Sequence, residues 1–329
     1  MTEARITPNR INPDWIAVDW IAVDWGTSNL RAWAMGAGGI LAEASSEDGM
    51  GKLARDGFEP ALLRLIGPWL DGRALGRRGL DGRGLDAGPV PVIACGMVGS
   101  RQGWCEAAYR TVPCTPLDAA ALVAAPTTDP RLTVRIAPGL KQTAPADVMR
   151  GEETQIAGVL SLMPGYDGVL CLPGTHSKWA QISAGEVVSF QTFMTGEMFA
   201  LLSEASVLRH GLQGDGWDDA AFDAAVSDAL SRPERLGARL FSLRAEGLIA
   251  GLTPAAARAR LSGLLIGTEL AAARPYWLGQ RVTLVGAATL SGAYAQALRS
   301  QGVEAAHLSV SDCTLAGLSS LALQPEAAR

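Results

Sequence analysis

The stretch Ile21-Ala22-Val23-Asp24-Trp25-Gly26-Thr27-Ser28-Asn29-Leu30-Arg31 decides the fold that this sequence predicts. An apolar run ends in an acid, a turn of glycine and small polar residues follows, and a second apolar run begins, which is the pattern of a β-hairpin. Asp24 is placed to hold a magnesium ion against phosphate oxygens. Because Asp, Gly, Ser and Asn are also common in ordinary turns, this stretch alone leaves a plain hairpin open as the alternative. We expect the backbone N–H groups of the turn to face phosphate oxygens, namely those of Gly26, Thr27, Ser28 and Asn29.

A second stretch of the chain has the same organisation. Val169–Leu172 is an apolar strand, a turn with Gly174 and Thr175 follows, and another strand begins near Lys178. The two Gly-Thr hairpins are roughly 150 residues apart. As a pair they predict that the two turns bind the β- and γ-phosphates of ATP from both sides, with Gly174 and Thr175 at the nucleotide. Lys178 either adds positive charge there or lies on the protein surface.

Strands are expected early in each half of the chain and helices late. This repeated order predicts an α/β protein with two ribonuclease-H-like domains that flank a cleft for ATP and substrate. We place the boundary near Gly165. The expected parts are an N-terminal extension (1–14), an N-terminal domain with the substrate loops (15–165) and a C-terminal nucleotide-binding domain (166–329).

Three further segments have distinctive local patterns. The sequence Trp-Ile-Ala-Val-Asp-Trp occurs at 15–20 and again at 20–25, and only the second copy is followed by Gly-Thr. We therefore expect Asp24, and not Asp19, to be the acid of the hairpin. The stretch 71–88 is rich in glycine and arginine and predicts a flexible surface loop after a helix over 58–70. A short helix is expected over 118–125.

The composition limits the function. Of the 329 residues, 48% are hydrophobic and 19% charged, which indicates a globular protein, and the formal net charge of −5 argues against nucleic-acid binding. Five cysteines without a C-x-x-C pair favour reduced thiols, and three histidines are too few for a multi-histidine metal site. No apolar run reaches membrane-spanning length and the N-terminus is polar, so we predict a cytoplasmic protein with no membrane partner. A homodimer is the assembly that the sequence leaves open.

Two acids stand at the start of an expected helix over 150–162. Phosphoryl transfer requires positioning and charge neutralisation, and a carboxylate is expected within hydrogen-bond reach of the attacking hydroxyl. Glu152 and Glu153 are the candidates, and we favour Glu152 as the catalytic base. The alternative is that first-turn glutamates only complement the helix dipole.

Two loops that follow buried strands are candidate ligand loops. Gly286 follows the strand Val282–Val285, where close backbone approach suits the adenosine of a nucleotide, although an ordinary strand-to-helix turn has the same pattern. The loop Gly96–Trp104 carries Ser100 and Arg101 among its glycines, and it reads either as a substrate loop or as a structural Ω-loop. We expect Arg101 to pair with a carboxylate and Trp104 to stack on a sugar-like face.

With these motifs in place, the sequence resembles the 2-dehydro-3-deoxygalactonokinase family, part of the sugar kinase, Hsp70 and actin superfamily. The resemblance extends from about Ile16 to Leu323, and its stretches are long and chemically unusual. They are Asp24–Trp33 (DWGTSNLRAW), Gly96–Trp104 (GMVGSRQGW), Met149–Gln155 (MRGEETQ), Leu172–Trp179 (LPGTHSKW), Thr192–Phe199 (TFMTGEMF), Phe241–Arg244 (FSLR) and Leu261–Glu269 (LSGLLIGTE). The duplicated strand, the loop over 71–88 and the plain Gly286-Ala-Ala-Thr289 depart from the pattern, and they leave the adenosine contacts open.

The resemblance implies ATP- and magnesium-dependent phosphorylation of the 6-hydroxyl of 2-dehydro-3-deoxy-D-galactonate. This sugar acid carries a carboxylate that needs a cationic partner, for which Arg101 is the first choice and Arg31 and Arg244 follow. Glu197 is expected at the cleft as a substrate-binding residue and as the rival of Glu152 for the role of base. The alternatives are a kinase of the same superfamily with another small sugar or sugar acid as substrate, and a non-catalytic protein gated by a nucleotide.

Overall fold

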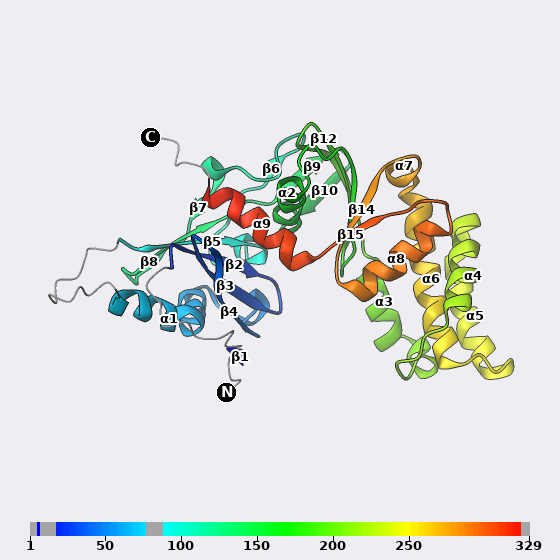
Figure 1. Ribbon diagram of the computed structural model, residues 1–329. Helices are drawn as coiled ribbons and strands as arrows, with labels where there is room; N and C mark the ends of the chain where they lie inside the picture. The colour runs from blue at the N-terminus through cyan, green and yellow to red at the C-terminus, as the bar shows by residue number, and fades with distance from the viewer. Residues whose placement is uncertain (1–4, 7–17, 77–87, 324–329) are drawn as a thin grey trace. The chain divides into compact units, whose positions relative to one another are not determined.

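The computed structural model describes residues 5–6, 18–76 and 88–323, and its chain divides into two compact units. Unit 1 comprises Met1–Pro164 together with Ser311–Arg329, and unit 2 comprises Gly165–Val310. Each unit is built on its own β-sheet with helices against it (Figure 1).

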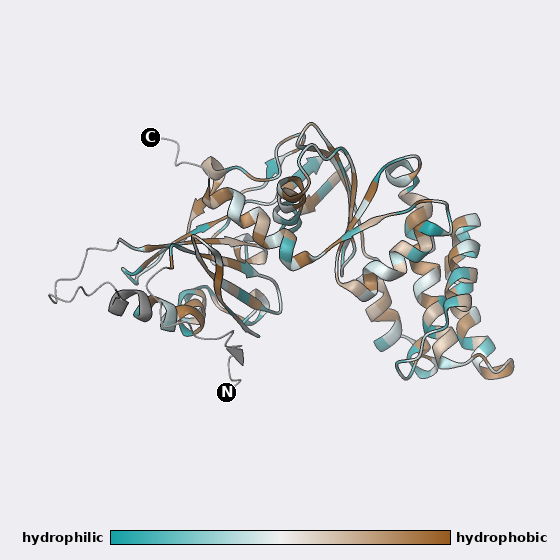
Figure 2. Ribbon diagram, in the orientation of Figure 1, coloured by the Kyte–Doolittle hydropathy of each residue, from teal (hydrophilic) through white to brown (hydrophobic). Residues whose placement is uncertain are grey.

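The sheet of unit 1 has the strand order β1-β4-β3-β2-β5-β8-β7. The hairpin strands β2 and β3 pair antiparallel with Asp24 opposite Arg31, β4 continues the meander, and β2, β5 and β8 run parallel. The parallel strands β2 and β5 are almost entirely buried and mostly hydrophobic (Figure 2), as expected for strands covered on both faces. The bounds are β1 Arg5–Ile6, β2 Trp20–Trp25, β3 Leu30–Gly36, β4 Gly39–Ser46, β5 Val90–Cys95, β7 Val123–Ala124 and β8 Leu132–Ile136.

The described residues of unit 1 also form three α-helices and a small sheet, in addition to short 3₁₀ helices. The helices are α1 (Phe58–Gly76), α2 (Glu152–Leu162) and α9 (Val310–Ala322). The small sheet has the order β10-β9-β6, with bounds Ala146–Met149, Leu140–Thr143 and Arg110–Thr111.

The last helix, α9, packs against unit 1, whereas the expected second domain ran to residue 329. A Cβ on Gly158 of α2 would lie 1.8 Å from the carbonyl oxygen of Cys313, and one on Gly317 would lie 2.0 Å from that of Thr154. The two glycines therefore allow α2 and α9 to touch backbone to backbone. Leu318 of α9 is buried in one cluster with residues of β2, β3 and β5. The partner of a terminal helix is a long-range contact, which the local pattern of residues 311–323 does not contain.

The sheet of unit 2 repeats the arrangement of unit 1. Its order is β13-β12-β11-β14-β15, with an antiparallel meander β11-β12-β13 and parallel β11, β14 and β15. This is the same order and direction as β4-β3-β2-β5-β8, so the prediction of two ribonuclease-H-like domains is confirmed. The bounds are β11 Gly168–Leu172, β12 Ser177–Ser183, β13 Glu186–Phe193, β14 Val282–Val285 and β15 Ala306–Leu308.

A layer of helices accompanies the sheet of unit 2 (Figure 1). Within it, Gly263 and Gly267 of α6 lie so close to α4 that an added Cβ would be 2.6 and 2.7 Å from carbonyl oxygens of that helix. The helices are α3 Thr195–Glu204, α4 Asp219–Ser231, α5 Leu236–Ile249, α6 Pro254–Ala272, α7 Arg274–Trp277 and α8 Ala288–Arg299.

Several local expectations need correction. The helix expected over 118–125 is a three-residue 3₁₀ helix, Ala119–Ala121, followed by the edge strand β7, since pairing with β8 gives these residues a sheet partner. Helix α1 continues to Gly76, into the segment expected to be a loop. Residues 77–87 of that segment lie outside the described residues. Residues 7–17, which include the start of the first Trp-Ile-Ala-Val-Asp-Trp copy, also lie outside them. No helix among the described residues is long and apolar enough to cross a membrane.

Candidate active site

The turn of the first hairpin is held from behind by the chain that follows β4. The amides of Met50 and Gly51 donate to the carbonyls of Gly26 and Thr27, each over 2.9 Å. A Cβ on Gly49 would lie 2.2 Å from the carbonyl carbon of Ser28, so only glycine fits there. The turn is therefore a fixed structure rather than a free loop.

Only part of this turn offers amides to a ligand. The N–H of Gly26 donates to the carbonyl of Asn29 over 2.9 Å, which corrects the expectation that it faces a phosphate, because the hydrogen bond that closes the hairpin already uses it. Thr27, Ser28 and Asn29 are exposed. These three residues remain the candidates for phosphate contacts.

Asp24, at the end of β2, is paired with an arginine. Its Oδ2 lies 2.5 Å from Nη2 of Arg31, and its Oδ1 lies 4.0 Å from the thiol of Cys95. Arg31 also donates to Ser311 and lies over the ring of Trp33. Arg31, predicted to bind the substrate, is therefore the counter-ion of Asp24. Residues 18–76 and 88–323 contain no group of three or more metal-ligating side chains, but Mg²⁺ commonly uses one carboxylate with substrate phosphates and water, which Asp24 fits.

The ends of β2 and β5 meet the start of α2. Gly96, which follows β5, has φ +92°, and a Cβ there would lie 2.7 Å from the carbonyl oxygen of Trp25. Gly151, with φ +104°, precedes α2, and its Cβ would lie 3.5 Å from Cα of Gly96. Both positions need the left-handed conformation that glycine adopts without strain. They bring the head of α2 to the strand ends that carry Asp24.

The two glutamates at the head of α2 have different surroundings. Glu152 is half-buried, and its carboxylate accepts the backbone N–H of Arg150 over 3.1 Å. Glu153 is fully buried and accepts the N–H of Gly151 over 2.7 Å. Burial, and then the charge of Glu152, raise the pKa of Glu153 to about 8. Glu152 is therefore the one of the pair that a substrate can reach.

The loop after β5 differs from its predicted role at one residue. Trp104 is buried, stacks on Phe58 with ring centroids 6.2 Å apart, and packs edge-on against Trp25. The expectation that it stacks on a sugar is corrected, because its ring completes the core beneath the hairpin. Arg101 has a side chain that is 79% exposed and lies 3.6 Å from Glu106, whereas Ser100 is buried.

The second Gly-Thr hairpin of the chain, formed by β11 and β12 of unit 2, contacts the start of α3. A Cβ on Gly196 would lie 2.2 Å from the carbonyl oxygen of Gly174, and the N–H of Glu197 donates to the carbonyl of Thr175 over 2.9 Å. The Glu197 carboxylate is 2.6 Å from Nε2 of His176 in the hairpin turn. Lys178 is buried and its ammonium donates to the carbonyl of His176, so the surface alternative for it is wrong.

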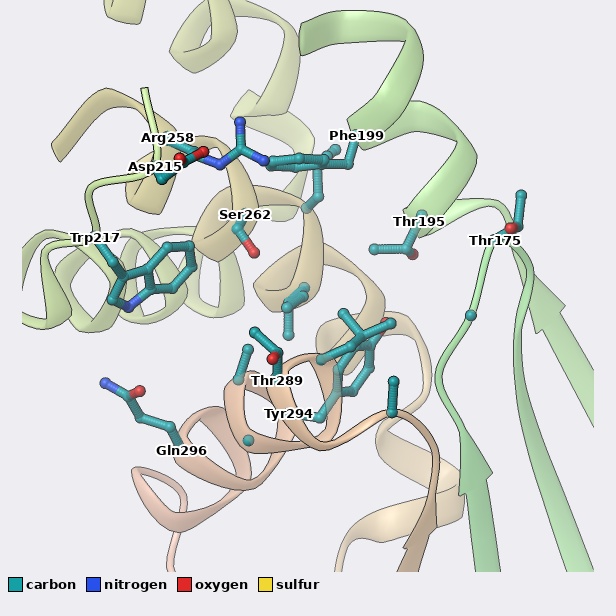
Figure 3. Close-up of a pocket in the computed structure, with 18 of the residues that line it drawn as sticks. Thr175, Thr195, Phe199, Asp215, Trp217, Arg258, Ser262, Thr289, Tyr294 and Gln296 are labelled. Carbon is teal, nitrogen blue, oxygen red and sulfur yellow. The ribbon is translucent and has the colours of Figure 1, made fainter. Parts of the chain in front are cut away.

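A cavity of about 730 Å³ opens beside this hairpin, lined entirely by residues of unit 2 (Figure 3). The second hairpin, α3, the segment 215–217, α6 and α8 all contribute to its walls. Ala287 lines the cavity, and Gly286 is the residue before it in the sequence. A Cβ on Gly286 would lie 2.6 Å from the hydroxyl of Ser291. Labelled lining residues are Thr175, Thr195, Phe199, Asp215, Trp217, Arg258, Ser262, Thr289, Tyr294 and Gln296.

Several lining residues were missed by the sequence interpretation. Trp217 is 43% exposed, and Arg258 lies over the ring of Phe199 at 5.2 Å. Trp217 follows Gly214-Asp215-Gly216, a turn sequence before an exposed aromatic residue, and that was the available signal. Arg258 has no comparable signal, because it is one of several arginines on helices.

A buried carboxyl lies behind the cavity. Glu269 of α6 accepts hydrogen bonds from Trp179 of β12 over 2.7 Å, from Tyr294 of α8 over 2.7 Å and from Thr195 of α3. Tyr294 also bonds to Ser177 over 2.9 Å. Burial raises the pKa of Glu269, and the hydrogen bonds oppose that rise. Glu269 therefore connects strand β12 of the second hairpin to α3 and α8, two helices that line the cavity.

Comparisons with known proteins identify relatives over most of this chain. The sequence model of the 2-keto-3-deoxy-galactonokinase family matches residues 24–321. "Probable 2-dehydro-3-deoxygalactonokinase DgoK1" of Rhizobium meliloti (strain 1021) is 39% identical over 306 residues, 90% of this chain and 94% of that protein. The 2-dehydro-3-deoxygalactonokinase of Escherichia coli (strain K12) is 33% identical over 302 residues, 90% of this chain and 95% of that protein. A crystal structure from Sinorhizobium meliloti with a provisional assignment to the same activity has a TM-score of 0.80 at 39% identity, covering 92% of this chain and 98% of that one.

Proposed function

The chain belongs to the 2-keto-3-deoxy-galactonokinase family, and we propose on that basis that it transfers the γ-phosphoryl group of ATP to the 6-hydroxyl of 2-dehydro-3-deoxy-D-galactonate. The product is the 6-phosphate of that sugar acid. The observation that carries the proposal is the 39% identity to the Rhizobium meliloti relative over nine-tenths of the chain.

The nucleotide is proposed to bind in the cavity of unit 2. The adenosine occupies the space between Trp217 and α8, and the phosphates extend to the hairpin that carries Gly174 and Thr175. The cavity volume of about 730 Å³ is in the range of small-molecule and cofactor sites. The buried ammonium of Lys178 supplies positive charge behind the same hairpin.

Asp24 would hold a magnesium ion through one carboxylate oxygen, with phosphate oxygens and water as the other ligands. Such an ion neutralises charge on the transferring phosphoryl group.

Glu152 is the proposed general base. It accepts the proton of the 6-hydroxyl while that oxygen forms a bond to the γ-phosphorus and the bond to the ADP oxygen breaks. Glu197 is the weaker candidate, since its carboxylate already bonds to His176. Ser100, in the loop after β5, is proposed to contact the sugar acid.

A coupled assay of ADP release with ATP and Mg²⁺ tests the proposal. We compare 2-dehydro-3-deoxygalactonate, its gluconate epimer, common hexoses and no sugar. Release that depends on the galactonate compound is expected. Glu152→Gln should lower kcat by about 10²–10⁴-fold, and Glu197→Gln should lower it much less. Faster ADP release with another sugar would change the assigned substrate. If a protein that binds nucleotide showed no sugar-dependent ADP release, the kinase proposal would be overturned.

A further inference from the structure

Arg150 and Ser100 are buried side chains of unit 1 with polar atoms that lack hydrogen-bond partners among the described residues. Arg150, just before α2, is 9% exposed, and its Nε and Nη1 atoms have no hydrogen-bond partner among the described residues. Ser100, in the loop after β5, is 6% exposed, and its hydroxyl is likewise without a partner in that part of the chain. Buried polar groups are nearly always hydrogen-bonded, so both groups call for an explanation.

The two side chains are neighbours through a glycine. A Cβ on Gly99 would lie 2.8 Å from Nη1 of Arg150, so the guanidinium packs directly against the backbone that leads into Ser100. The rest of the guanidinium is fixed in place. Its Nη2 donates to the carbonyl of Ala107 over 2.7 Å, and its Cζ lies 4.4 Å from the ring centroid of Tyr109. The Nε and Nη1 donors are therefore held in place without a hydrogen-bond partner among the described residues.

The charge of Arg150 also lacks a direct counter-ion. None of the ion pairs found within residues 18–76 and 88–323 includes its guanidinium. Glu152 bonds to its backbone N–H instead, and Glu153, with a pKa of about 8, is mainly neutral at pH 7. A buried guanidinium without an anionic partner is unfavourable, so an anion at its free edge would stabilise it.

We propose that the Ser100 hydroxyl and the unpartnered Nε and Nη1 donors of Arg150 form the subsite for the carboxylate of the sugar-acid substrate, an inference that rests on the proposed function. A guanidinium and a hydroxyl are both hydrogen-bond donors to a carboxylate, and the positive charge of Arg150 strengthens the hydrogen bonds that it donates. Arg150 precedes Glu152 by two residues, so one short segment holds the acid end of the substrate and supplies the base for its other end.

This assignment replaces the predicted role of Arg101. The Arg101 side chain is 79% exposed and pairs with Glu106, and a solvated cation binds a carboxylate less strongly than a buried one. Arg101 and Gln102 are both exposed, whereas Ser100 and Arg150 are buried.

The test compares the sugar acid with an analogue in which a primary amide replaces the carboxylate. Ser100→Ala should raise KM for the acid about tenfold or more, hardly change KM for the amide, and leave Tm unchanged or higher, because this hydroxyl has no partner to lose. Arg150→Met should abolish most of the preference for the acid, and Arg150→Lys, which keeps the charge but not the planar guanidinium donors, should be intermediate. Arg64→Met, on the exposed face of α1, removes an arginine elsewhere in unit 1 and should behave as wild type.

Each other outcome overturns the inference in a recognisable way. An unchanged KM in Ser100→Ala, or equal losses for acid and amide in Arg150→Met with a lower Tm, would give these residues a structural role only. If Arg101→Met lost the preference for the acid over the amide and Arg150→Met kept it, Arg101 would be the residue that binds the substrate carboxylate. A wild-type protein that does not phosphorylate the sugar acid would instead remove the proposed function itself.

Discussion

At the scale of single residues, the acid pair at the head of α2 shows how burial separates two identical side chains. Glu152 and Glu153 are adjacent and both complement the helix N-terminus, so their sequence roles are equivalent. Successive residues of a helix point in directions about 100° apart, and only Glu153 points into the protein. Burial raises the pKa of Glu153 to about 8, whereas Glu152 is only half-buried and stays accessible.

The raised pKa of Glu153 predicts a pH-dependent stability. Its pKa rises from 4.5 in the unfolded chain to about 8 in the folded one, so between these values the folded state holds the extra proton. The slope of the unfolding free energy with pH is then negative. The stabilisation that this carboxyl contributes is complete below about pH 4.5 and is lost as the pH rises through about 8.

Glu153→Gln removes that titration while its amide oxygen still accepts the N–H of Gly151. We expect the variant to gain stability relative to wild type as the pH rises from 5 to 8.5, by an amount on the order of a few kcal/mol at most. Chemical denaturation at a series of pH values measures this difference. A difference from wild type that is independent of pH would show that Glu153 is not the titrating group.

At the scale of elements, the start of α3 and the second hairpin are fitted to each other. Gly196 brings the first turn of α3 against the carbonyl of Gly174, and Glu269 of α6 ties Thr195 to Trp179 of β12 from behind. The position of the second hairpin therefore depends on contacts with α3 and α6 as well as on its own turn.

Gly196→Ala should displace the hairpin. The added Cβ would lie 2.2 Å from a backbone oxygen and 2.9 Å from Cα of Thr175, neither of which can rotate away. We expect a loss of about 1–3 kcal/mol in stability and a higher KM for ATP. Denaturant unfolding and the kinase assay measure the two effects.

Gly237→Ala is the matched control, because nothing lies within 4 Å of its Cβ in helix α5. It should stabilise the protein by up to about 1 kcal/mol through helix propensity. Wild-type behaviour of Gly196→Ala would mean that the hairpin does not depend on its contact with α3.

At the scale of the whole molecule, two sheets of the same strand order carry the same functional feature at the same place. In each unit the Gly-Thr turn joins the central strand to the next strand of the meander, at Gly26–Thr27 in one and Gly174–Thr175 in the other. Unit 2 combines its hairpin with a cavity of about 730 Å³ that is lined by residues of the same unit. This combination is the reason to assign the nucleotide to unit 2.

Nucleotide binding should therefore be visible at Trp217. Titration with ADP and Mg²⁺ is expected to change the tryptophan fluorescence, and Trp217→Phe should lose most of that change although eight of the nine tryptophans remain. Ligand at a hundred times Kd should stabilise the wild-type protein by about 2.7 kcal/mol. An equal fluorescence change in both proteins would place the nucleotide away from Trp217.

The local features of this protein were predictable from its sequence. Both hairpins, the strand Val282–Val285 and most helices follow from apolar periodicity and turn residues, which act over a few neighbouring positions. The small strands β6, β9 and β10 escaped prediction because short strands are defined by their partners more than by their own residues.

The sequence by itself determined the repeated strand-and-turn order, and through it the two ribonuclease-H-like domains and the positions of the hairpins. Tertiary structure alone decided which side chains face a ligand. It buried Trp104, Lys178 and Glu153, paired Arg31 with Asp24, left Arg150 without a counter-ion and joined α9 to unit 1. The physical reason is that backbone conformation depends on neighbouring residues, whereas burial and charge environment depend on partners far away in the chain.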